Sequence, residues 1–218
     1  KEYIKRAFEF AQQAMAKDDT FVWSYLALGG AYYAKREHDK AVITMKRSVD
    51  LQPNDADAWT FLGFYLHWAG HGNEAIVALK TAQRLNPKFI SRRNVVFLAM
   101  AYSTAGKYRK AIETILPHYA SFARRGRPAM GYLAAAYAAN GDRKKAQATM
   151  KEYLAKKPKY RISNYPMLKN YKRAEDRERF AALLRKAGMP ERATVAPVNE
   201  KSIAVLPFKN MSDDKAHE

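Results

Sequence analysis

The feature that most constrains the fold of this chain is an internal repeat with a period of about 35 residues. The intervals between four alanines are 34, 36 and 35 residues: Ala41, Ala75, Ala111 and Ala146. Four leucines are separated by the same three intervals: Leu28, Leu62, Leu98 and Leu133. Two landmarks that share one irregular spacing indicate that a single structural unit is repeated. Such units stack on one another, because none can bury its apolar face alone.

Each period carries the pattern of two helices. An apolar or aromatic residue, a Leu, a small residue and a Tyr or Leu follow one another at spacings that place them on one helical face. The four copies are Tyr25-Leu28-Gly29-Tyr32, Trp59-Leu62-Gly63-Leu66, Val95-Leu98-Ala99-Tyr102 and Met130-Leu133-Ala134-Tyr137. The repeated alanine supplies a small surface on the second helix. Glycines fall where the first helix should end, and prolines follow three of the second helices: Gly70, Gly106 and Gly141, then Pro53, Pro87 and Pro158.

This arrangement resembles the tetratricopeptide repeat (TPR) family, in which W-x2-L-G-x2-Y is followed by the alanine and then the proline. The resemblance covers roughly residues 3–159. It implies an all-α fold, a right-handed superhelix of antiparallel helix pairs. The units expected are a half-repeat over 1–19, repeats over 22–55, 56–91, 92–126 and 127–159, and a cap over 160–189 that contains a charged amphipathic helix.

A second resemblance concerns the context of the repeats. The stretch RLNPKFISRRNVVFLAMAYSTAGKYRKA (84–111) and the ending RFAALLRKAGMPE (179–191) resemble the repeat region of bacterial class III adenylate cyclase-like signalling proteins. The tail 201–218 (KSIAVLPFKNMSDDKAHE) resembles the opening strand of their TolB-like α/β domain, and 190–200 is interpreted as a linker. In that family the TolB-like segment precedes the repeats. Here it follows them, either because the architecture is rearranged or because an upstream segment is numbered after the repeats.

The net charge of +18 is concentrated in the second half of the chain. Residues 1–85 carry 11 basic and 10 acidic side chains, whereas 86–131 carry 9 and 1, and 142–189 carry 15 and 5. A field of this sign favours an acidic protein face, nucleic acid or an anionic membrane as partner. The alternative is that Lys and Arg solvate the outward faces of the helices.

The residues that would carry chemistry are missing or badly placed. The chain has no cysteine, which suits a reducing, cytoplasmic compartment, and no glycine-rich phosphate-binding motif. His67 and His71 are four residues apart, but glycines mark the helix end there and no third ligand is evident, so no metal site is expected. The longest apolar run, 129–139, is shorter than the roughly 20 residues of a membrane-spanning helix. We therefore expect neither an enzyme nor a cofactor.

The TPR resemblance implies a binding groove lined by the first helix of each repeat. The inward positions expected to bind a partner are Trp23, Leu26, Tyr33, Thr60, Phe64, His67, Trp68, Arg93, Val96 and Met100, followed in the last repeat by Gly131, Ala135, Ala138 and Ala139. Aromatic and Arg side chains are favoured binding anchors, although some of these aromatics could instead pack against the next repeat. Some TPR domains clamp a carboxylate with Lys and Asn. The corresponding positions are Ala27, Phe61, Phe97 and Tyr132, so that clamp is not expected.

The function expected from the sequence is a non-catalytic protein–protein interaction scaffold in a bacterial signalling protein. Its groove would bind a peptide or a neighbouring domain, with an acidic partner favoured by the basic charge. Two alternatives stay open. A nucleic-acid-binding repeat would need its basic residues in one stripe, with aromatics free to stack on bases. A homo-oligomerisation domain would instead be completed by a second copy of the chain.

Overall fold

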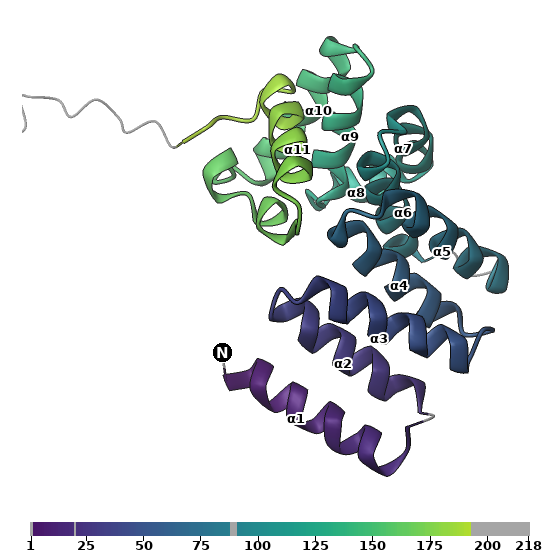
Figure 1. The fold of residues 1–218 in the computed structure, drawn as a ribbon. Helices are drawn as coiled ribbons and strands as arrows, with labels where there is room; N and C mark the ends of the chain where they lie inside the picture. Colours follow the sequence, from purple (N-terminus) through teal and green to yellow (C-terminus); the bar gives the residue numbers. More distant parts are fainter. Residues whose placement is uncertain (1, 20, 88–90, 193–218) are drawn as a thin grey trace, which may run out of the picture.

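The computed structural model describes residues 2–19, 21–87 and 91–192, which form helices and turns and contain no β-strand. One helix, α1 (Glu2–Lys17), precedes the pairs and packs on the first of them. The pairs, stacked side by side in Figure 1, are α2 (Val22–Ala34) with α3 (His38–Leu51), α4 (Ala56–Ala69) with α5 (Gly72–Leu85), α6 (Arg92–Thr104) with α7 (Tyr108–Ile115), and α9 (Ala129–Ala139) with α10 (Arg143–Lys156). This confirms the all-α TPR superhelix.

The repeated small residues form the interfaces within the pairs. Ala41, Ala75, Ala111 and Ala146 are all fully buried. A Cβ atom added at Gly63 of α4 would lie 2.4 Å from Leu79 Cγ of α5 and 3.1 Å from the Ala75 carbonyl oxygen. The two helices therefore approach as closely as backbone and side chains allow, as the sequence pattern predicted.

The turns inside the pairs need a left-handed residue. Gly70, Gly106 and Gly141 supply it in three repeats, as predicted. In the first pair Arg36 takes this role with φ 64°, which is an uncommon conformation for a residue with a Cβ atom. No glycine occupies this position, yet the turn has the same left-handed conformation and the same type of backbone hydrogen bond, from the Glu37 N–H to the Tyr32 carbonyl oxygen.

The second helix of the third repeat is broken by a proline. α7 ends at Ile115 and is followed by the 3-10 turn η1 (Leu116–His118), which contains Pro117, and by the short helix α8 (Tyr119–Ala123). Proline cannot donate a backbone hydrogen bond and clashes with the preceding turn, so the helix cannot continue straight. The residues after the break lie against the first turn of α6, where Arg92 Nη1 is 3.5 Å from Ser121 Oγ.

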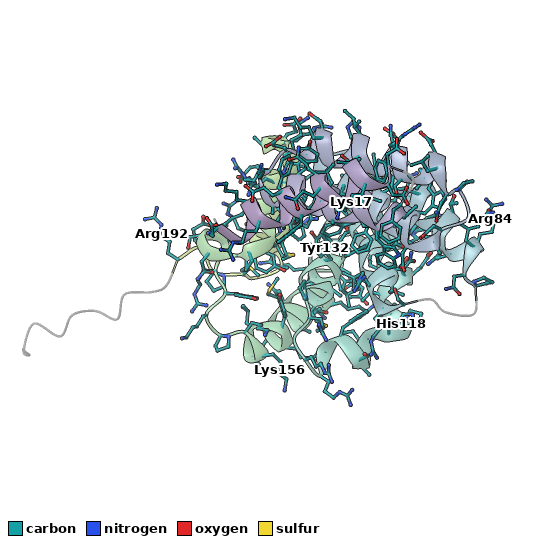
Figure 2. The ribbon with its side chains drawn as sticks, turned by 90° about the horizontal axis from the view of Figure 1, so that it is seen from below. Lys17, Arg84, His118, Tyr132, Lys156 and Arg192 are labelled. Carbon is teal, nitrogen blue, oxygen red and sulfur yellow. The ribbon has the colours of Figure 1, made fainter. Side chains whose placement is uncertain are left out.

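The C-terminal cap packs on the last repeat. Helix α11 (Ala174–Lys186) lies against α9, and the Phe180 ring is stacked on Tyr132 with centroids 4.4 Å apart. Tyr165, between η2 (Ile162–Asn164) and η3 (Pro166–Asn170), closes over Gly131. In Figure 2 Tyr132 lies near the centre of the molecule, whereas Arg84, Lys156 and Arg192 lie at its periphery.

The segment between α10 and α11 does more than cap the end. We call residues 157–173 the strap, because they reach from the last repeat back to the first two. The Lys172 backbone N–H donates to the Trp68 carbonyl oxygen at 2.9 Å, and the Lys172 ammonium pairs with Asp39 of α3 at 2.7 Å. The strap was not predicted from the sequence, which indicated only a terminal capping helix.

Other expectations concern the far end of the chain and the membrane. Except for residues 190–192, the linker expected over 190–200 and the strand-like tail expected over 201–218 lie outside the described residues. Among the helices that the structure describes, none combines the length and apolar character required to cross a bilayer.

Candidate binding groove

Four half-buried aromatic side chains form the open part of the groove, and we call them the aromatic strip: Tyr33, Phe61, Phe64 and Phe97. They come from α2, α4 and α6, the first helices of three successive repeats. The Phe64 ring lies 5.2 Å from Tyr33 and 4.4 Å from Phe97, measured between centroids. The strip is thus continuous from Tyr33 through Phe64 to Phe97, whereas the Phe61 ring packs on Tyr65 with centroids 6.4 Å apart.

The strip continues into a region of positive charge. The Arg93 guanidinium lies over the Phe61 ring, 5.5 Å from its centroid, and Val96 is half-buried on the same helix. Next to them, Phe97 lines a cavity of about 360 Å³ between α6 and α8. One surface therefore offers apolar rings and a cation within a short distance of each other.

The structure leaves six of the ten predicted groove residues accessible. Leu26, Tyr33, Phe64 and Val96 are half-buried, and Trp23 and Arg93 are exposed. It brings Tyr33 and Phe64 together within the strip. For Trp23, 59% exposed near the start of α2, the described residues provide no ring contact with the strip.

Four of the predicted residues, Thr60, His67, Trp68 and Met100, are buried and cannot line an open groove. Thr60 Oγ1 donates to the Ala56 carbonyl oxygen at 2.9 Å and lies 3.5 Å from the amide nitrogen of Asn94 on α6. Met100 belongs to the common hydrophobic core. For these two residues, packing between neighbouring repeats explains the difference from the prediction.

The strap explains why the other two residues, His67 and Trp68, are buried. Its Tyr171 ring lies 5.5 Å from the His67 ring and 4.9 Å from the Trp68 ring, and covers both. The cap has the same effect on the small residues expected to line the groove in the last repeat: Gly131, Ala135 and Ala138 are buried and Ala139 is half-buried. The chain itself therefore fills the groove at α9, and the strip remains open at α2, α4 and α6.

The His67 side chain is fully buried, and only one of its two ring nitrogens has a hydrogen-bond partner in the described structure. Its Nδ1 lies 2.7 Å from Thr104 Oγ1, and within the described structure its Nε2 has no hydrogen-bond partner. Burial lowers the pKa of His67 from 6.5 to about 3, so its imidazole is neutral in the folded protein.

This burial predicts a pH-dependent stability. Below pH 6.5 the unfolded chain binds a proton at His67 that the folded chain does not, so stability is lost as the pH falls toward 3. For the wild type, relative to His67→Gln, we expect the free energy of unfolding to fall by about 2 kcal/mol between pH 7 and pH 5. Urea unfolding of both proteins at each pH measures this. Parallel pH dependences would show that His67 is charged in the folded state.

Two residues of the aromatic strip were not among the predicted groove residues. Phe61 and Phe97 were considered only as positions of a carboxylate clamp. They are 36 residues apart, the interval between their repeats, and both are aromatic. That equivalence was a usable signal, because aromatics at matching positions of successive first helices meet along one surface.

The stacked helix pairs and the groove along their first helices define a helical-repeat scaffold of the TPR class. Residues 24–55 match the family model described as tetratricopeptide repeat, so the chain contains a TPR region. Over 91 residues it is 33% identical to the peroxisomal targeting signal receptor of Kluyveromyces lactis, and 32% identical to that of Candida albicans. The first match covers 42% of this chain and 16% of the receptor, so the chain spans about a sixth of its relative's length.

Solved structures share the fold over most of the chain. A MamA protein is 26% identical, with a TM-score of 0.56, and the match covers 76% of this chain and 87% of MamA. YrrB, described as a TPR protein with an unusual peptide-binding site, is 15% identical with a TM-score of 0.56, covering 81% and 90% of the two chains. The second likeness shows the fold alone. TPR repeat proteins are generally non-catalytic interaction scaffolds.

Proposed function

We propose that this protein binds an extended peptide segment of a partner protein along the aromatic strip. One observation carries the proposal: the half-buried rings of Tyr33, Phe64 and Phe97, from the first helices of three successive repeats, touch one another and keep part of their surface open. Large apolar rings held in one conformation lose little entropy when a partner covers them, which makes them good anchors.

The similarity to the peroxisomal targeting signal receptors supports a peptide-like ligand. Their name describes receptors for a targeting signal, and 91 residues of this chain match such a receptor at 33% identity. By analogy with a targeting signal, the proposed partner of this chain is a short peptide segment of another protein. Its identity does not follow from the match, because only 16% of the receptor is covered.

The cellular setting is proposed from the sequence. The resemblance of 84–111 and 201–218 to bacterial class III adenylate cyclase-like proteins supports a role for the scaffold within a cytoplasmic signalling protein. There it would bind a partner or a neighbouring domain and leave the output to other domains.

The test is a comparison of peptide binding between matched variants. Peptides are selected from a random phage-displayed library on the wild-type protein, and their affinities are measured by calorimetry. The double variant Phe61→Ala/Phe97→Ala removes two anchors from the strip, and we expect it to weaken binding at least about tenfold.

The control variant also truncates two apolar side chains to alanine, but on the second helices of the repeats. Ile43 and Val77 are 66% and 64% exposed on α3 and α5, and Ile43→Ala/Val77→Ala should leave the affinity unchanged. Circular dichroism verifies that both variants keep their helices. Selection of no peptide, or equal binding by both double variants, would refute the aromatic strip as the site.

A further inference from the structure

Five arginines surround the cavity of about 360 Å³ next to the aromatic strip, and we call this site the arginine pocket. They are Arg92, Arg93, Arg124, Arg125 and Arg127, and the remaining lining consists of Val96, Phe97, Ser121, Phe122 and Pro128. A cavity of this volume is within the range of sites that hold a small ligand or a few side chains.

Within the described part of the chain, the guanidinium groups of this pocket lack acidic partners. Among the described residues, none of the five lies within 4.0 Å of a carboxylate. Some arginines elsewhere do have such a partner: Arg173, Arg179 and Arg185 each lie 2.6–2.7 Å from a carboxylate oxygen. Between residues 75 and 141 the only acidic residue is Glu113.

The pocket is built by local features of the third repeat. Arg92 and Arg93 begin α6, and the break at Pro117 lets α8 lie against that first turn. After α8 the chain turns tightly, with Gly126 in the left-handed region at φ 55°. The backbone N–H groups of residues 125 and 127 both donate to the Phe122 carbonyl oxygen, which holds the turn in place. Arginines on either side of Gly126 are thereby fixed close to those of α6.

Charges of one sign that are held together repel one another, so an anion that enters the pocket relieves this repulsion. Guanidinium groups also bind carboxylates in a bidentate manner. The apolar lining from Val96, Phe97 and Pro128 can cover the methylene groups of a bound side chain. The pocket therefore suits a ligand with several anionic groups on short apolar stems.

We propose that the arginine pocket binds the carboxylates of an acidic segment in the same peptide partner whose apolar side chains lie on the aromatic strip. This inference rests on the proposed function, because Phe97 belongs to both the strip and the pocket. Nucleic acid fits less well. Phe122 is only 2% exposed, and Phe97 is half-buried with one side packed on Phe64, so the pocket offers no fully exposed ring on which a base could stack.

The experiment uses a fluorescein-labelled peptide made of Glu and Leu, and the same peptide with Gln in place of Glu. Fluorescence anisotropy measures the affinity for the full chain. We expect the acidic peptide to bind at least about tenfold more tightly than its neutral counterpart, and Arg124→Gln/Arg125→Gln to remove most of that difference. Arg124→Lys/Arg125→Lys should restore it only in part, because Lys binds as a point charge.

A matched control separates the pocket from the general positive field. Lys144→Gln/Lys151→Gln removes the same charge from two exposed positions of α10, and should change the affinity less than about twofold. An equal loss in both double variants would overturn the proposal, as would equal binding of the Glu and Gln peptides or failure of the acidic peptide to bind. Tighter binding of a single-stranded oligonucleotide, lost in the arginine variant, would overturn it in favour of nucleic acid.

The two proposals can fail separately. If the arginine variant binds the acidic peptide like the wild type while Phe61→Ala/Phe97→Ala binds selected peptides weakly, the pocket is refuted and the strip stands. If the arginine variant loses the acidic peptide while Phe61→Ala/Phe97→Ala binds the selected peptides like the wild type, the aromatic strip is refuted, and the pocket binds an acidic ligand without it.

Discussion

Replacement of Trp68 with alanine is expected to lower the free energy of unfolding by about 3–5 kcal/mol. The Trp68 side chain is 1% exposed, and the rings of Phe64, His67 and Tyr171 surround it at centroid distances between 4.4 and 6.0 Å. Truncation would leave a large cavity between α4 and the strap. Urea unfolding monitored by circular dichroism measures the loss.

Two further substitutions test whether the loss of stability in Trp68→Ala comes from the buried volume of the Trp68 side chain. Trp68→Phe should cost less than half as much, because in the described structure the Trp68 Nε1 has no hydrogen-bond partner and its removal leaves no acceptor unpaired. Trp23→Ala should cost no more than about 0.5 kcal/mol, since that side chain is 59% exposed. Equal costs for Trp23→Ala and Trp68→Ala would contradict the burial of Trp68 beneath the strap.

The second large effect is expected at Gly72, the first residue of α5. A Cβ atom there would lie 2.6 Å from the Ala105 backbone nitrogen and 3.0 Å from Ala105 Cα. The backbone of a turn between two packed helices cannot move as the end of a flexible side chain can. We expect Gly72→Ala to destabilise the protein by about 3 kcal/mol, seen as a lower Tm and a lower urea midpoint.

Two other glycines provide the controls. At Gly106 an added Cβ atom meets nothing within 4 Å but φ is +72°, so alanine should cost about 1 kcal/mol from the backbone alone. Gly30 lies inside α2, and its Cβ atom would be 3.7 Å from Tyr65 Oη. Alanine should stabilise that helix by about 0.5–1 kcal/mol. A Gly72→Ala variant no less stable than Gly106→Ala would disprove the close contact.

The repeat architecture could be predicted because it depends on local, periodic features. The alanines at fixed intervals mark where helices touch, and all four are fully buried. Gly70, Gly106 and Gly141 mark the turns because left-handed backbone favours glycine. Arg36 shows the limit of this reasoning, since packing on both sides of the turn imposes the same conformation on a residue that does not favour it.

The strap could not be predicted in the same way. It has no repeat partner, and its contacts join residues far apart in the sequence, such as Lys172 with Asp39. Helical periodicity identified which face of α4 points inward, but not which positions on that face another segment would cover. The sequence therefore predicted His67 and Trp68 as partner-binding residues of the groove, whereas the structure buries both side chains.

The strap also changes the order in which this protein can be completed. In an ordinary helical-repeat array each unit is finished as soon as its neighbour folds, so the N-terminal repeats are settled while the rest of the chain is still being synthesised. Here the inward face of α4 receives its cover from Tyr171 and Lys172, about a hundred residues later. Until the ribosome has released them, Trp68 is packed on Tyr33, Phe64 and His67 but lacks the ring of Tyr171. We therefore expect the newly made protein to pass through a stage at which one face of this side chain is available for aggregation or for a chaperone.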